Sequence, residues 1–215
     1  MTLLVRHLST QAYEPIWHAM QHFTQERDKN TDDEIWCLQH QPVFTQGQAG
    51  KAEHLLKPGN IPVVQVDRGG QVTYHGPGQL VCYLLLDLRR LGFGARELVT
   101  RIENALINVL KYYDIDAQNK ADAPGVYVDG AKIAALGLRI RRACSFHGLS
   151  LNIDMDLSPF SAINPCGYQN LAITHMKALN PEATLQTVEE QLVTELIKQL
   201  NYHSVTHTTA LYSYD

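Results

Sequence analysis

Apolar residues recur along this chain with two periods, and each period predicts a different secondary structure. In three segments they return every third or fourth residue, which places them on one face of an α-helix. In other segments they form short runs or alternate with polar residues between Gly, Pro or Asp, as in β-strands. The predicted helices span about 13–27, 95–113 and 185–200. The predicted strands begin near Glu34, Pro42, Pro62, Gln71, Gln79, Val126, Ala131 and Ser145.

The order of these elements is helix, several strands, helix, several strands, helix. Strands that cluster in runs favour an α+β fold with a mostly antiparallel sheet over a repeated βαβ arrangement. The turn residues agree, since Gly-Pro-Gly at 76–78 separates two strands and Asp-Gly at 129–130 is typical of a tight hairpin. The 215 residues contain no repeat or long linker, so we expect one domain spanning 1–215.

Composition and charge exclude several classes of function. Hydrophobic residues make up 45% of the chain and charged residues 19%, which excludes a disordered protein. A formal net charge of −4 disfavours nucleic acid as the main partner. The longest apolar run, Leu80 to Leu86, is far shorter than the roughly 20 residues of a membrane helix. Without a secretory signal pattern, we expect a cytoplasmic protein with its four cysteines as free thiols.

One polar, glycine-rich segment, RGGQVTYHGPGQ from Arg68 to Gln79, is a candidate binding site. Consecutive glycines permit positive φ angles and close approach of a ligand, and the Arg68 guanidinium offers a fork of donors to an anion. The alternative is a glycine-rich hairpin with a solvated arginine. The segment lacks the G-x-G-x-x-G spacing of a dinucleotide site.

Two further residues are candidates for chemistry. Lys132 begins an apolar strand among small residues, where partial burial would either lower its pKa or make it a fixed positive charge; the alternative is a lysine that extends from the strand end to solvent. Cys166 lies between Pro165 and Gly167, outside any apolar run, so it is either a reactive thiol on a loop or an inert cysteine. His147 could orient a substrate or form a hydrogen bond with a loop carbonyl. No histidine, cysteine or carboxylate spacing indicates a metal site, and we expect no metal and no cofactor.

Together these segments resemble the octanoyltransferase (lipoyl/octanoyl transferase) family of lipoate biosynthesis. The resemblance rests on RGGQVTYHGPGQ, ADAPGVYVDGAKIAALGLRI, CSFHGLSLNI and INPCG, and extends from about Glu34 to Gly167. It implies a single α+β domain related to the catalytic domain of biotin and lipoate ligases. The transferase core would span about 30–185, followed by a C-terminal helix at about 185–200.

The resemblance also implies roles for individual residues. Cys166 corresponds to the nucleophile that carries the acyl group as a thioester, and Lys132 to the lysine that assists it. The substrate-binding positions are implied to be Arg68, Gly69, Gly70, Gln71, Val72, Thr73, Tyr74, His75, Ala135, Leu136, Gly137, Gly148, Leu149 and Ser150.

The implied reaction transfers an octanoyl group from octanoyl-acyl carrier protein to a lysine of a lipoyl domain. The implied acceptors are the lipoyl domains of 2-oxo acid dehydrogenases and the glycine cleavage H protein. Two alternatives stay open: an ATP-dependent lipoate or biotin-type ligase, which would not need Cys166, and a non-catalytic module that binds acyl carrier protein. Arg139, Arg141 and Arg142 are either a docking patch for an acidic partner or a solvated strand end.

Overall fold

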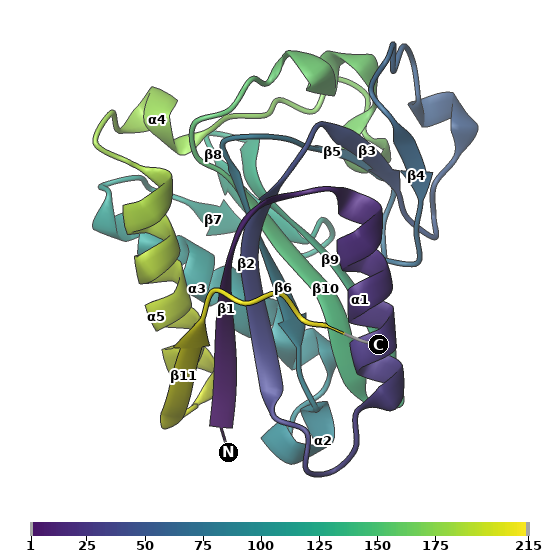
Figure 1. Ribbon diagram of the computed structural model, residues 1–215. Helices are drawn as coiled ribbons and strands as arrows, with labels where there is room; N and C mark the ends of the chain where they lie inside the picture. Colours follow the sequence, from purple (N-terminus) through teal and green to yellow (C-terminus); the bar gives the residue numbers. More distant parts are fainter. Residues whose placement is uncertain (1, 214–215) are drawn as a thin grey trace.

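The computed structural model describes residues 2–213 and is built around one large mixed β-sheet (Figure 1). The strand order is β11-β1-β2-β6-β10-β9-β8-β7, and a smaller sheet has the order β4-β3-β5. In the large sheet β1 runs parallel to β2 and β11, whereas the other neighbours are antiparallel. The predicted α+β class and mostly antiparallel sheet are therefore confirmed. The strands are β1 (Thr2–Gln11), β2 (Asp33–His40), β3 (Val43–Gln46), β4 (Val63–Gln65), β5 (Val72–His75), β6 (Gln79–Leu85), β7 (Gln118–Asn119), β8 (Gly125–Val128), β9 (Ala131–Arg141), β10 (Cys144–Asn152) and β11 (Ser204–Thr208).

Helices cover both faces of the large sheet (Figure 1). On one face α3 and α5 pack against each other and against the main hydrophobic core. On the other face α1 buries a second cluster that includes Trp36 and Tyr83. No helix in the described part of the chain is long and apolar enough to span a bilayer. The helices are α1 (Tyr13–Glu26), α2 (Leu88–Leu91), α3 (Ala95–Tyr112), α4 (Met176–Leu179) and α5 (Leu185–Leu200), with short 3-10 helices η1 (Ala52–His54), η2 (Ser158–Ala162) and η3 (Pro165–Gly167).

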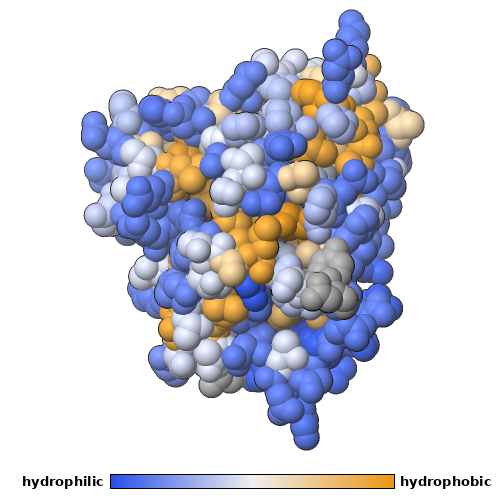
Figure 2. Space-filling view, in the orientation of Figure 1, coloured by the Kyte–Doolittle hydropathy of each residue, from blue (hydrophilic) through white to orange (hydrophobic). Residues whose placement is uncertain are grey.

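The small sheet lies above one end of the large sheet, beside the loops that follow β10 (Figure 1). Phe44, Val72 and Tyr74 on this sheet share an apolar cluster with Phe160 and Ile163 from the η2 region. Apolar side chains also reach the surface over this sheet (Figure 2). This cluster fixes the segment that precedes Cys166 against the paired strands β3 and β5.

The first and last strands pair at one edge of the large sheet. β11 pairs in parallel with β1, with Thr2 opposite Ser204 and Arg6 opposite Thr208. The following segment crosses toward α1, where the Tyr212 ring stacks on Trp36 (Figure 1). The domain limits predicted from the sequence, including a core at 30–185, stay a prediction.

Candidate active site

Lys132 lies at a β-bulge near the start of β9. Tyr127 of β8 is opposite Lys132 and Val126 is opposite Ala134, so Ile133 is the extra residue on the β9 side. A bulge changes the direction of the side chains beside it. Here Ile133 enters the main core while Lys132 is directed toward a cavity, with only 4% of its surface exposed. The alternative of a surface lysine is therefore wrong.

Cys166 lies in the tight turn η3 between two short apolar segments. Both Cys166 and Gly167 have left-handed backbone angles, φ 57° and φ 81°, a conformation that is unfavourable for most residues other than glycine. The turn is closed by the N–H of Gly167 donating to Asn164 O at 2.9 Å, and the N–H of Asn164 in turn donates to His54 O at 2.8 Å. These bonds hold the thiol, the only described cysteine that is not buried, at the cavity wall.

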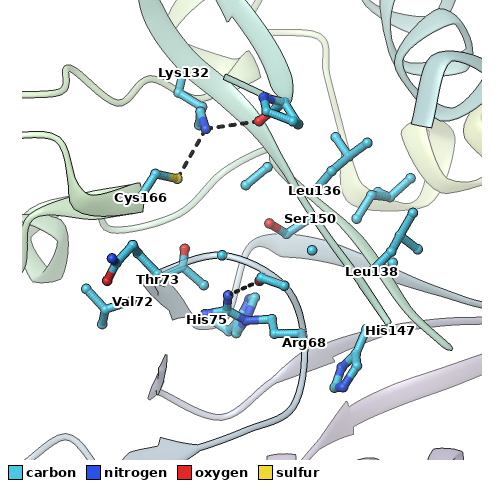
Figure 3. Close-up of a pocket in the computed structure, with 18 of the residues that line it drawn as sticks. Arg68, Val72, Thr73, His75, Lys132, Leu136, Leu138, His147, Ser150 and Cys166 are labelled. Carbon is cyan, nitrogen blue, oxygen red and sulfur yellow. Dashed lines mark hydrogen bonds between the residues drawn. The ribbon is translucent and has the colours of Figure 1, made fainter. Parts of the chain in front are cut away.

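The chain after η3 returns to β9 and brings the two candidates together. The N–H of Lys132 donates to Ala172 O at 2.8 Å, and the N–H of Thr174 donates to Lys132 O at 3.0 Å. As a result Lys132 Nζ lies 3.2 Å from Cys166 Sγ, although the residues are 34 positions apart in sequence (Figure 3). Nζ also donates to Pro124 O at 3.2 Å.

Two opposing effects act on the charge of Lys132. Burial favours the neutral amine, but the Cys166 thiolate, by charge and hydrogen bonding, and Tyr127 favour the ammonium. The net result is a raised pKa for Lys132, so the lowered pKa expected from burial is wrong and the fixed positive charge is favoured. An ammonium beside the sulfur stabilises the thiolate, which is the nucleophilic form of cysteine.

The cavity has a volume of about 390 Å³ and contains nearly all the predicted binding positions. The exception is Tyr74, which projects from the opposite face of β5 to Thr73 and His75 and packs on Phe44 and Phe160. Along the cavity floor, Ala135 pairs with Ser150 and Gly137 with Gly148. Small residues on these two strands leave the space that larger side chains would fill.

Arg68 is buried, contrary to the alternative of a solvated arginine. Its guanidinium donates to the Thr45 carbonyl at 2.6 Å, to the Thr45 hydroxyl and to the Gly69 carbonyl. The N–H of Gly69 donates to Leu138 O at 3.0 Å, which fastens the glycine-rich segment to β9. A Cβ on Gly137 would lie 3.1 Å from Arg68 Cδ and 3.3 Å from Gly69 O, so a side chain there would crowd the two segments. Arg68 thus shapes the cavity by binding the protein itself.

His147 lies at the end of the cavity distant from Cys166 (Figure 3), where it belongs to a polar network. His147 Nε2 and Trp17 Nε1 both lie within 2.9 Å of Asp67 Oδ1. Burial of Asp67 favours its neutral form, but the hydrogen bonds from His147 and Trp17 outweigh it and lower its pKa. His147 therefore orients Asp67 and, through Trp17, the helix α1. Its partner is a side chain, whereas the sequence suggested a substrate or a loop carbonyl.

Two further buried histidines near this network are held neutral. Burial lowers the pKa of His40 to about 4 and that of His75 to about 3. His40 Nε2 contacts the Tyr83 hydroxyl at 2.7 Å, and His75 Nδ1 contacts Gln79 Oε1 at 2.7 Å. His40 Nδ1 also lies 3.1 Å from the Gln11 carbonyl oxygen. Because a carbonyl or amide oxygen only accepts, the neutral rings of His40 and His75 both carry their proton on Nδ1, and His40 Nε2 accepts from Tyr83.

Several lining residues have no sequence signal that marks them as functional. Tyr13, Val81 and Tyr83 line the cavity from α1 and β6, but along the sequence they read as ordinary core positions. Asp122, Ala123 and Pro124 also line it, and only the Pro-Gly pair at 124–125 marks this segment as a turn. In the described part of the chain, no group of three or more His, Cys, Asp or Glu side chains is arranged to hold a metal ion.

Comparison with known proteins identifies the family. Residues 12–197 match the family model described as the lipoyl protein ligase A/B catalytic domain. An octanoyltransferase of Pseudomonas syringae pv. syringae is 62% identical over 215 residues, covering 100% of this chain and 99% of that protein. One from Shewanella piezotolerans is 59% identical over 210 residues, covering 98% and 96%. The chain belongs to the octanoyltransferase family. It is an acyltransferase that moves octanoyl groups.

Solved structures share the fold of this octanoyltransferase at low identity. A bi-partite lipoate protein ligase of Thermoplasma acidophilum gives a TM-score of 0.73 at 13% identity, covering 98% of this chain and 88% of that one. A lipoate-protein ligase A bound with ATP gives 0.71 at 12% identity, covering 97% and 89%. The fold is therefore shared with ligases, and the high identity to octanoyltransferases separates this chain from the ligase alternative.

Proposed function

We propose that the enzyme takes its octanoyl group from octanoyl-acyl carrier protein and holds it on Cys166 as a thioester. The acyl group then passes to a lysine of a lipoyl domain, as found in 2-oxo acid dehydrogenases and the glycine cleavage H protein. The contact of 3.2 Å between Lys132 Nζ and Cys166 Sγ carries this proposal. The structure of the archaeal ligase with its E2 lipoyl domain supports the acceptor class. A reducing cytoplasm is part of the proposal, because catalysis needs the thiol free.

In the first step, the Cys166 thiolate attacks the octanoyl carbonyl and a new C–S bond forms. The bond to the carrier's sulfur breaks, and the leaving thiolate takes a proton from the Lys132 ammonium. The exchange of one thioester for another involves little net free energy, so no ATP is required. Lys132 is then a neutral amine beside an uncharged thioester.

In the second step, the amine of the acceptor lysine attacks the Cys166 thioester. Lys132 takes the proton from the attacking nitrogen as the amide forms and the Cys166 thiolate leaves. The opposing effects on Lys132 fit this change of role. Acylation removes the negative sulfur that raises the pKa of Lys132, while the burial that lowers this pKa remains. The same side chain is therefore an ammonium before acylation and a base after it.

The intact mass of the protein tests the thioester directly. Wild type and Cys166→Ala are mixed with octanoyl-acyl carrier protein without an acceptor. We expect an octanoyl adduct on wild type only, which disappears when a lipoyl domain is added. Transfer by Cys166→Ala would overturn the proposal in favour of direct transfer. Transfer that needs ATP and free octanoate would instead select the ligase alternative.

A further inference from the structure

A single peptide group lies between Lys132 and the interior of α3. It joins Pro124 to Gly125, and its two polar ends face in opposite directions. The Pro124 carbonyl accepts from Lys132 Nζ at 3.2 Å, and the Gly125 N–H donates to Glu103 Oε1 at 3.0 Å in a buried bond. A continuous chain of contacts therefore links the Glu103 carboxylate to Cys166 Sγ through Lys132.

Glu103 is an unusual residue for its position on α3. It is only 5% exposed, beside Ile102 and Leu106, which are fully buried in the main core. Burying a carboxylate is unfavourable unless hydrogen bonds compensate it, and an apolar residue would serve packing alone better. The hydrogen bonds that Glu103 makes in the described structure all go to 119–125, from Gly125 N–H and from Asn119 Nδ2 at 2.8 Å.

The peptide group has little freedom to move. Gly125 has φ +136°, which L-residues with a side chain rarely adopt. A Cβ there would lie 2.7 Å from Ala134 O and 3.2 Å from Lys132 Cε. The backbone is therefore packed directly against the Lys132 side chain, and a change in the orientation of the peptide moves the carbonyl that Nζ contacts.

We propose that Glu103 is a positioning residue that orients and polarises the Pro124–Gly125 peptide so that its carbonyl holds Lys132 Nζ at Cys166. A hydrogen bond to a charged group is stronger than a neutral one, and hydrogen bonds in series polarise each other. A negative charge at the N–H end thus makes the carbonyl oxygen a better acceptor for Nζ. The inference rests on the proposed function, in which Lys132 serves the Cys166 thiol.

Glu103 matters most after Cys166 has been acylated. Before acylation, the thiolate itself attracts the Lys132 ammonium. In the acyl-enzyme that negative charge is gone. The remaining contacts of Lys132 Nζ are the hydrogen bond to the Pro124 carbonyl and the Tyr127 ring, whose centroid lies 5.1 Å away. Lys132 must nevertheless meet the attacking amine in this state. Loss of the Glu103 charge should therefore slow discharge of the acyl-enzyme more than its formation.

Single-turnover kinetics of the two half-reactions test this inference. Acylation is followed by intact mass with octanoyl-acyl carrier protein, and discharge is followed after a lipoyl domain is added. For Glu103→Gln, which keeps the shape and an acceptor oxygen, we expect discharge to slow about 10-fold, because a hydrogen bond to a charged group is replaced by a weaker neutral one. Acylation should stay within about 3-fold of wild type, a change of less than 1 kcal/mol.

Two other variants separate positioning from a structural role. Glu97→Gln makes the same change at an exposed site on α3, where Glu97 pairs with Arg101, and should leave both rates unchanged. Glu103→Asp keeps the charge, so its discharge rate should lie between those of wild type and Glu103→Gln. The inference would be overturned if Glu103→Gln slowed both half-reactions equally, or if its discharge rate matched that of wild type. If wild type itself forms no acyl-enzyme, the proposed function fails instead.

Discussion

At the scale of single residues, the proposed chemistry depends on where the Lys132 ammonium is held. Lys132 touches a sulfur in the η3 turn, and a carbonyl oxygen and an aromatic ring at the start of β8. The turn at Cys166 and the bulge at Ile133 are both local departures from regular structure. Their combined effect is a reactive pair whose geometry is set by backbone hydrogen bonds.

Removing the ammonium tests its effect on the thiol. In Lys132→Ala, Cys166 should react with iodoacetamide at pH 7 roughly 10-fold more slowly, because the thiolate loses its stabilising charge. Alkylation is measured by mass spectrometry of the peptide that contains Cys166. Lys120→Ala is the matched control, since Lys120 lies over the Tyr127 ring at 4.1 Å and has no described contact with Cys166. Alkylation of Lys132→Ala at the wild-type rate would contradict the role.

The sequence allowed only part of this residue-level detail to be predicted. Cys166 was a candidate because Pro and Gly flank it and no apolar run contains it. Its contact with Lys132 followed from the family resemblance alone, since no local pattern brings together residues 34 positions apart. No pattern in the sequence marked Glu103 as functional, because a glutamate beside apolar helix positions is usually exposed. Its burial depends on a loop that packs over α3.

At the scale of elements, β9 and β10 form the cavity by carrying small residues where their neighbours carry large ones. The pairs Ala135–Ser150 and Gly137–Gly148 lie side by side on the floor. An acyl chain laid along them would be buried against these strands. Each buried methylene of the acyl chain contributes about 0.8 kcal/mol of binding free energy. The length of cavity along these strands therefore sets how strongly the enzyme distinguishes acyl chains of different length.

A larger side chain on this floor should change the preferred acyl chain. In Ala135→Leu, the new side chain fills part of the cavity, so octanoyl transfer should fall relative to hexanoyl transfer by about 4-fold per methylene excluded. Competition between hexanoyl- and octanoyl-carrier proteins measures the ratio. A thermal melt of the variant controls for misfolding. An unchanged ratio in a folded variant would show that the acyl chain lies elsewhere.

Helices were predicted better than strands at this scale. The three long helices end within a residue of the prediction, because each has a continuous apolar stripe. The predicted hairpin at Asp129-Gly130 is confirmed, with positive φ at both residues. β1, β7 and β11 were not predicted. β7 has only two residues, β11 is the polar edge strand, and β1 beside it carries polar residues at many positions, so none of the three shows an apolar strand pattern.

At the scale of the whole molecule, α1 and the strands beneath it enclose a group of neutral imidazoles. His40 and His75 have ring centroids 5.9 Å apart and share the space beside Tyr13 and Tyr83. Protonating either ring would place an unsolvated charge in this region. The folded state therefore resists protonation that the unfolded chain accepts freely.

Stability should fall in acid for this reason. The unfolded chain binds protons at these histidines below about pH 6.5, whereas the folded pKa values are about 4 for His40 and 3 for His75. The free energy of unfolding should decrease as pH drops from about 6.5, by about 2 kcal/mol per histidine at pH 4.5. Urea denaturation at several pH values measures it. His75→Gln should flatten the profile, and the exposed control His203→Gln should not. Identical slopes would contradict this account.

The pairing of β11 with β1 has a consequence for biosynthesis. Ser204 reaches its partner Thr2 only after about 200 intervening residues have been made. At 5 to 20 residues per second, the nascent chain carries β1 with one open edge for roughly 10 to 40 s. During that time β2 can pair with β1, but its other edge exposes unpaired backbone groups that invite contact with other chains. Completion of the sheet therefore waits until residues 204–208 have been made, and until then the open edge of β1 needs protection from other chains.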